Sequence, residues 1–121
     1  MLLPLKDEAA AHPVPVCWRA TLTEVVAALA NDSLESLASG AVFAEPAVVS
    51  QIRVAVQDYG ETLVELPIEV WRSSRCQWMG DCWDVLVDLW TLESGPSDLV
   101  LFARIIEATP YRFEIQGVWV P

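Results

Sequence analysis

The chain has 121 residues, and its seven Lys or Arg against seventeen Asp or Glu give a formal net charge of −10. Its length predicts one domain, and an apolar content of 54% excludes a disordered chain because it is enough to form a hydrophobic core. One Lys and six Arg cannot supply a basic face for direct nucleic-acid binding, and the lack of a run of about 18 uncharged apolar residues excludes a membrane span.

The N-terminal residues predict an extended segment. Residues 1–20 contain Pro4, Pro13 and Pro15, so we expect an extended lead-in to a single domain formed by residues 20–121. The chain begins with a few apolar residues and then becomes charged, whereas a signal peptide places positive charge before a longer apolar stretch. We therefore expect a cytoplasmic protein.

The first half of this domain predicts helices. The first helix starts at the capping-box sequence 21–24, and it either continues past Ser33 or restarts there before it ends at Gly40. The second starts at Pro46, which suits a first helical turn, and ends at Gly60. Its apolar stripe consists of Val48, Val49, Ile52, Ala55, Val56 and Tyr59.

The second half predicts an antiparallel sheet. Residues 68–71 fit either a short strand or a turn of helix, and residues 72–82 are polar and irregular. The strand at 99–106 is apolar on both faces apart from Arg104, which indicates a central position in the sheet. The predicted fold is α+β, with N-terminal helices on one face of a C-terminal meander of three to four strands. The strands lie at 83–90, 99–106 and 111–120.

Groups suited to catalysis or metal binding are sparse. The single histidine, His12, lies in the proline-rich lead-in, and no nucleophile, phosphate-binding or zinc-binding motif occurs. The three cysteines lack the paired spacing of metal ligands, so we expect Cys17, Cys76 and Cys82 to be small buried residues. We expect no enzyme activity, no cofactor and no metal.

Carboxylates without nearby basic residues indicate a binding surface. The stretch from Asp81 to Ala103 holds five acidic residues and no Lys or Arg. Trp90 shares one strand face with Asp84 and Asp88, and this face is either partly exposed or covered by helices. The predicted partner-binding residues are Asp84, Asp88, Trp90, Glu93 and Asp98, with Asp81 and Trp78 at the edge.

Other tryptophans are expected in the core. Strand alternation predicts that Trp83 is buried, together with Trp119 or its neighbours.

Two segments, YGETLVELP (59–67) and WDVLVDLWTLESGPSDL (83–99), resemble a group of small bacterial domains with a W-x-V-x-x-D-L-W-T-x-E-x-G-x-S-D-L stretch. Domains of this size and acidity occur among the immunity proteins of contact-dependent growth-inhibition and polymorphic toxin systems. The resemblance covers residues 20–120 and implies a protein that binds and neutralises a cognate toxin domain. A cationic nuclease is the expected partner, because carboxylates can occupy its phosphate sites.

Two other functions agree with the sequence. A small ligand-binding or enzyme-like domain would have its pocket near Arg72 and Arg75, which could hold an anion. A homo-oligomeric accessory protein would associate through the apolar faces of strand 99–106.

Overall fold

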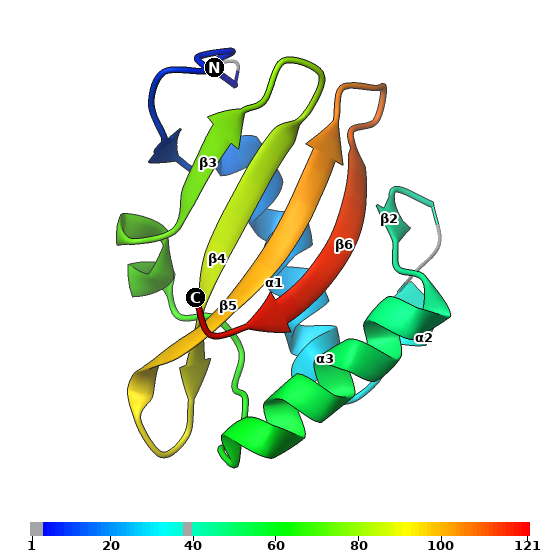
Figure 1. Ribbon diagram of the computed structural model, residues 1–121, viewed down its shortest axis with the longest axis vertical. Helices are drawn as coiled ribbons and strands as arrows, with labels where there is room; N and C mark the ends of the chain where they lie inside the picture. The colour runs from blue at the N-terminus through cyan, green and yellow to red at the C-terminus, as the bar shows by residue number, and fades with distance from the viewer. Residues whose placement is uncertain (1–3, 38–39) are drawn as a thin grey trace.

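The computed structural model describes residues 4–37 and 40–121, which form one sheet with α-helices behind it or beside its edge (Figure 1). The described elements, in chain order, are β1 (His12–Pro13), α1 (Val16–Ala30), α2 (Leu34–Leu37), β2 (Val42–Phe43), α3 (Pro46–Tyr59), the 3₁₀ helix η1 (Ile68–Arg72), β3 (Arg75–Trp78), β4 (Trp83–Thr91), β5 (Gly95–Ile106) and β6 (Arg112–Trp119).

The sheet has six strands in the order β1-β3-β4-β5-β6-β2. Neighbouring strands are antiparallel except β2, which runs parallel to β6. The predicted α+β class and the central position of β5 are therefore confirmed. The predicted count of three to four strands is wrong, because β1 and β2 come from the N-terminal half. β1 precedes α1 and β2 lies between α2 and α3, so helices and strands are not separated along the chain as predicted.

The lead-in is shorter than predicted. Helix α1 begins at Val16, directly after Pro15, so the predicted capping box at 21–24 lies inside the helix and is wrong. The earlier start brings Trp18 into the core, where it is fully buried. The lead-in before α1 bends at residues 8–10 and includes β1. It packs on the domain, since the Trp83 indole Nε1 donates to the Leu5 carbonyl at 2.9 Å. Residues 1–3 of the predicted lead-in lie outside the described residues.

The turn after α1 shows that the first helix does not continue past Ser33 and that a second helix restarts after it. The helix ends at Ala30, Asp32 adopts a left-handed φ of 51°, and a new short helix starts at Leu34. Helix α3 has the predicted bounds, and Gly60 ends it with a φ of 80°, a conformation that glycine adopts without steric cost.

Residues 68–82 are more regular than predicted. The segment 68–71 becomes part of η1, one of the two structures expected there. The prediction of an irregular 72–82 is wrong, because Arg75–Trp78 forms strand β3 between β1 and β4. Four residues give too little alternation to reveal a strand by sequence, and the pairing with β4 supplies the stability.

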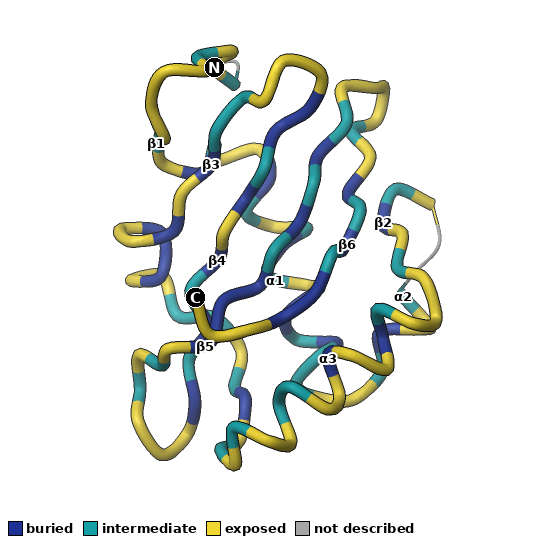
Figure 2. Tube along the Cα trace, viewed as in Figure 1, coloured by how far each residue is buried: buried dark blue, intermediate teal, exposed yellow. Residues whose placement is uncertain are grey.

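The core lies between the sheet and the helices. Buried residues alternate with half-buried or exposed ones along β4, as the tube in Figure 2 shows. Trp83 is 1% exposed, as predicted, whereas Trp119 is 39% exposed and its neighbour Val118 takes the buried position. None of the described helices is long and apolar enough to cross a membrane.

Candidate functional site: the open face of the sheet

One face of the central sheet has no helix over it in the described part of the chain, and it is turned toward the viewer in Figure 1. We call it the open face. Strand alternation and register assign to it the residues Arg75, Gln77, Asp84, Leu86, Asp88, Trp90, Val100, Phe102, Arg104, Arg112, Glu114 and Trp119. Asp84 and Asp88 share this uncovered face, as strand alternation predicts. Trp90 alternates onto the same side of β4, but it follows a register shift and packs, half-buried, against the core.

An apolar strip crosses the middle of this face. Leu86 on β4 lies opposite Phe102 on β5, and the rings of Phe102 and Trp119 meet edge to face with centroids 5.5 Å apart. Leu86 is 43% exposed, and Phe102 is half-buried. Apolar side chains held at a sheet surface in this way form a preorganised contact area. We call Leu86, Phe102 and Trp119 the apolar strip.

The apolar strip was not predicted from the sequence. In the sequence Leu86 lies between two acidic positions, Asp84 and Asp88, and the predicted surface was based on those carboxylates. Strand alternation nevertheless places all three residues on one face. The prediction of a buried residue at Trp119 or its neighbours left the direction of the Trp119 side chain open, and it is Val118 that is buried. The signal that could have found them is the alternation of β5, which puts Phe102 on the same face as Arg104.

Charges beside one end of the strip are compensated. The Arg104 guanidinium Nε lies 3.3 Å from the Asp84 carboxylate Oδ1, and Arg104 also lies opposite Glu114 on β6. The Nε of Arg112 bonds to Glu114 Oε2 at 2.9 Å. Arg104 is the first residue beyond the stretch 81–103 that contains no Lys or Arg, and antiparallel pairing brings it back to Asp84. The expectation that this carboxylate lacks a counter-charge is therefore wrong.

The other end of the strip is acidic. Asp88 and Asp98 line a hollow of about 490 Å³ together with residues of β5 and the C-terminal segment, and no basic residue lines it. Asp88 lies opposite Val100, so its cross-strand neighbour is apolar rather than cationic. This end of the open face can therefore attract a cation of a partner.

Glu93 lies at the tip of the β4–β5 hairpin and has an internal role. Its carboxylate accepts hydrogen bonds from the Thr62 backbone N–H at 2.8 Å and from the Thr62 hydroxyl at 3.0 Å. The backbone bond holds the pKa of Glu93 below its usual value. Because Thr62 engages both of its oxygens, Glu93 is a weaker candidate for partner binding than Asp88 or Asp98.

The two predicted edge residues lie away from the apolar strip. Asp81 is exposed in the β3–β4 turn, at the opposite end of β4 from Glu93. Trp78 lies on the helix side, where its ring is 4.6 Å from the ring of buried Trp83. Trp90 is half-buried and packs against the core at the end of β4. The structure thus places Asp84, Asp88 and Asp98 on or beside this face and separates Asp81 and Trp78 from its centre.

The long edges of the central sheet are closed by side chains and short strands. The Gln51 amide of α3 donates to the Val118 carbonyl at 2.7 Å and accepts from the Val118 N–H at 3.1 Å, as a neighbouring strand would. Gly117 permits this approach, because an added Cβ would lie 2.7 Å from the Gln51 Oε1. At the other edge, the Ser74 hydroxyl accepts from the Asp88 N–H at 3.1 Å. A partner therefore meets the face more readily than the edges.

The cysteines and the histidine were also considered in the sequence as reactive or metal-binding groups. Burial raises the pKa of Cys76 to about 11, so this thiol is not a thiolate nucleophile at neutral pH. Cys17 is exposed rather than buried as expected, and Cys82 is buried. His12 bonds to the Asp7 carboxylate at 2.8 Å in β1. No group of three or more His, Cys, Asp or Glu side chains among residues 4–37 and 40–121 is arranged to hold a metal ion.

The predicted pocket near Arg72 and Arg75 is not the cavity that the helices form. Arg75 is exposed and its Nη1 donates to the carbonyls of Arg72 and Ser74 at 2.9 Å. Neither arginine lines the cleft that the structure forms between α1 and α3.

Comparison with known families gives one match. The domain of unknown function DUF7668 matches residues 26–121, which include β3–β6 and therefore the strands of the open face. The chain belongs to the DUF7668 family. No curated protein and no solved structure matches this DUF7668 chain significantly.

Proposed function

We propose that this DUF7668 domain binds a protein partner through the open face and that it acts as an immunity protein that neutralises a toxin domain. The observation that carries the binding proposal is the apolar strip, which is held at the surface of a rigid sheet with no helix over it in the described residues. The assignment of the partner as a toxin rests on the sequence resemblance alone.

The apolar strip has the composition of a binding hot spot. Hot spots are rich in aromatic residues, they lie near the centre of an interface, and less important polar contacts surround them. Trp119 and Phe102 provide the aromatic area. The ion pair of Asp84 with Arg104 is the next cross-strand pair on the same face after Leu86 and Phe102. Docking would remove the exposed parts of these rings from water, which favours association.

The charges indicate the orientation and chemistry of the partner. The Asp84 end is locally neutral, whereas the hollow beside Asp88 and Asp98 is negative. A partner with an apolar centre and a Lys or Arg at one side would therefore fit in one orientation. A basic nuclease surface has this charge, and long-range attraction would speed its encounter with a protein of net charge −10.

Calorimetric titration with the toxin-like domain encoded by the neighbouring upstream gene tests the function. We expect nanomolar or tighter binding that weakens as salt is added. Trp119→Ala should weaken binding by roughly thirtyfold or more, as loss of a central aromatic residue does. Leu92→Ala, which removes an exposed apolar side chain at the hairpin tip, should change it little.

Charge reversal tests the orientation. Asp88→Lys should slow association at low salt more than Asp58→Lys, an equal change in net charge at an exposed position on α3. Equal effects of the two variants would mean that only total charge matters and that the acidic end of the open face is not in the interface. No heat with the neighbour-encoded domain at micromolar concentration would contradict the immunity function for that partner.

A further inference from the structure

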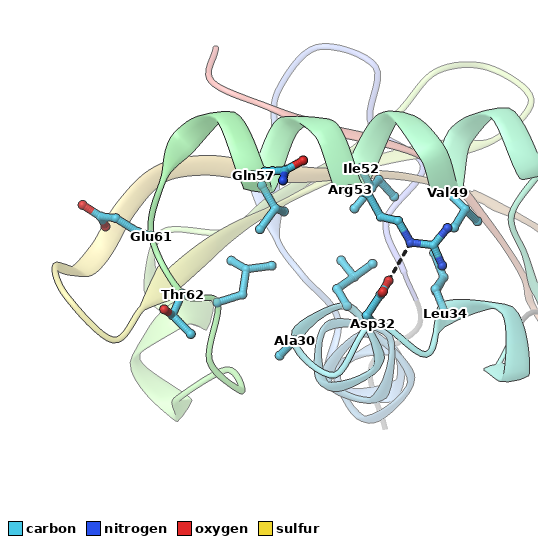
Figure 3. Close-up of a pocket in the computed structure, with 12 residues that line it drawn as sticks. Ala30, Asp32, Leu34, Val49, Ile52, Arg53, Gln57, Glu61 and Thr62 are labelled. Carbon is cyan, nitrogen blue, oxygen red and sulfur yellow. Dashed lines mark hydrogen bonds and ion pairs between the residues drawn. The ribbon is translucent and has the colours of Figure 1, made fainter.

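A cleft lies between α1 and α3, away from the open face (Figure 3). Figure 3 shows α1 end-on, with α3 passing across it, and the cleft between the two helices. Its volume is about 430 Å³, within the range of small-molecule sites. The walls are mainly apolar: Leu29 and Ala30 come from α1, Ile52 and Val56 from α3, and Leu63 from the segment after α3.

Ion pairs span one end of the cleft. Arg53 of α3 reaches the turn after α1, where its Nε bonds to the Asp32 carboxylate at 2.7 Å, and its Nη2 bonds to Glu35 of α2. These bonds raise the pKa of Arg53 and lower that of Glu35, whose own backbone hydrogen bond contributes most. These ion pairs connect α3 to the turn after α1 at one end of the cleft, and the apolar walls of the cleft lie beyond them.

At the other end of the cleft, the carboxylate of Glu61 already accepts hydrogen bonds from protein groups. Glu61 accepts hydrogen bonds from the Thr91 hydroxyl at 2.6 Å and from the Ser94 hydroxyl at 2.8 Å. Its side chain points away from the cleft in Figure 3. Every charged group that lines the cleft is therefore already bonded to a protein partner: Asp32 and Arg53 to each other, and Glu61 to two hydroxyls.

We propose that this cleft binds a small, uncharged, predominantly apolar molecule with a single hydrogen-bonding group, such as an alkyl or aryl alcohol. The apolar walls favour a hydrocarbon body, because its transfer from water is favourable. A charged end would lose hydration and would find only charges that are already paired. The Gln57 amide at the rim can bond to a neutral polar group, and the Thr62 hydroxyl, which donates to Glu93, can still accept a hydrogen bond from it.

A matched series of probes tests the ligand class. Octanol, octylammonium and octanoate have the same hydrocarbon chain and differ in charge. We expect octanol to shift the methyl NMR signals of Leu29, Ile52 and Leu63 in a saturable manner, and the two charged probes to bind about tenfold more weakly or less. Binding of either charged probe as tight as that of octanol would overturn the assignment of an uncharged ligand.

Two valines of α3 provide the variant and its control. Val56 lines the cleft, whereas Val54 is 55% exposed on the same helix. Val56→Phe should fill the space and abolish saturable octanol shifts, and Val54→Phe should leave them unchanged. If Val56→Phe does not fold, Ala30→Leu fills the cleft from α1 instead. No saturable shift in the wild-type protein, or equal shifts in the Val54 and Val56 variants, would overturn the proposal.

Discussion

The two faces of β4 have the same backbone and opposite surroundings. Val85, Val87 and Leu89 are fully buried against the helix side, whereas the alternating residues between them, such as Leu86 and Asp88, are reached by solvent. The inward set contributes to the free energy of folding by burial. The outward set contributes little to folding and is available for binding. A single strand thus carries the stability of the domain on one face and its proposed function on the other.

The comparison also separates two kinds of carboxylate. Asp84 is balanced by Arg104 on the neighbouring strand, whereas Asp88 lies opposite Val100 in a hollow without basic residues. Both residues have the same sequence context, an acidic position in an alternating strand. Only the register with β5 distinguishes them, and this register makes Asp88 the better candidate to meet a basic partner.

The largest expected effect compares two leucines of β4. Leu89→Ala should lower the free energy of unfolding by about 3 kcal/mol, because it leaves a cavity in a packed core. Leu86→Ala should lower it by about 1 kcal/mol or less, because Leu86 is partly exposed in the folded state. Urea unfolding monitored by tryptophan fluorescence measures both values. Equal losses would show that the open face is covered in solution, for example by a second copy of the chain.

The sequence predicts the long periodic elements well. Helix α3 and strands β4, β5 and β6 each contain enough residues to show a period. The predicted bounds of α3, β4 and β6 agree closely with the structure, whereas β5 begins at Gly95, four residues before its predicted start at 99. Strands β1 and β2 have two residues each, so they exist only because neighbouring strands pair with them. Such pairing depends on tertiary contacts between residues that are distant in the sequence.

The candidate site is also predictable from the sequence only where it depends on strand alternation. Alternation along 83–90 correctly places Asp84 and Asp88 together, but it does not reveal the register shift after Asp88 or the packing of Trp90 against the core. It does not reveal that Glu93 bonds to Thr62, because that contact joins segments 31 residues apart. It also does not show that Trp119 faces outward, since the irregular register of β5 with β6 lies between Phe102 and Ala103. Local pattern therefore finds a shared face, and tertiary contacts decide which of its residues remain available.

The next largest expected effect concerns the edge of β6, where Gln51 of α3 bonds to the backbone of Val118. Gln51→Ala removes both hydrogen bonds to the Val118 backbone and should lower the free energy of unfolding by about 1–2 kcal/mol. Gln57→Ala on the same helix is the matched control, because Gln57 is exposed and lines the cleft between α1 and α3 rather than the β6 edge. Hydrogen exchange at the Val118 N–H should accelerate only in the Gln51 variant. Unchanged exchange there would contradict the strand-like role of Gln51.

A smaller effect concerns pH and the hairpin tip. The pKa of Glu93 is lowered in the folded state, first by the Thr62 backbone hydrogen bond, so its contribution to stability is present above the usual glutamate value of 4.5. That contribution should disappear as the pH falls below 4.5 and through the lower folded-state pKa. Glu93→Gln should therefore show a shallower loss of stability with acid than the wild type, measured by urea unfolding between neutral pH and about pH 3. Parallel curves for the two proteins would mean that the Thr62 contact is absent in solution.

The smallest effect separates the two carboxylates of the open face. Asp84→Asn should lower the free energy of unfolding by about 0.2–1 kcal/mol, because it breaks a partly exposed ion pair with Arg104. Asp88→Asn should leave it unchanged or raise it slightly, since it reduces the acidic charge of a hollow without basic residues. Added salt should diminish the difference between the two variants, because it screens both the attraction at Asp84 and the repulsion at Asp88. Identical stabilities at low salt would show that Arg104 does not hold Asp84. Both carboxylates would then be equally available to a basic partner, and the orientation proposed for that partner would lose its basis.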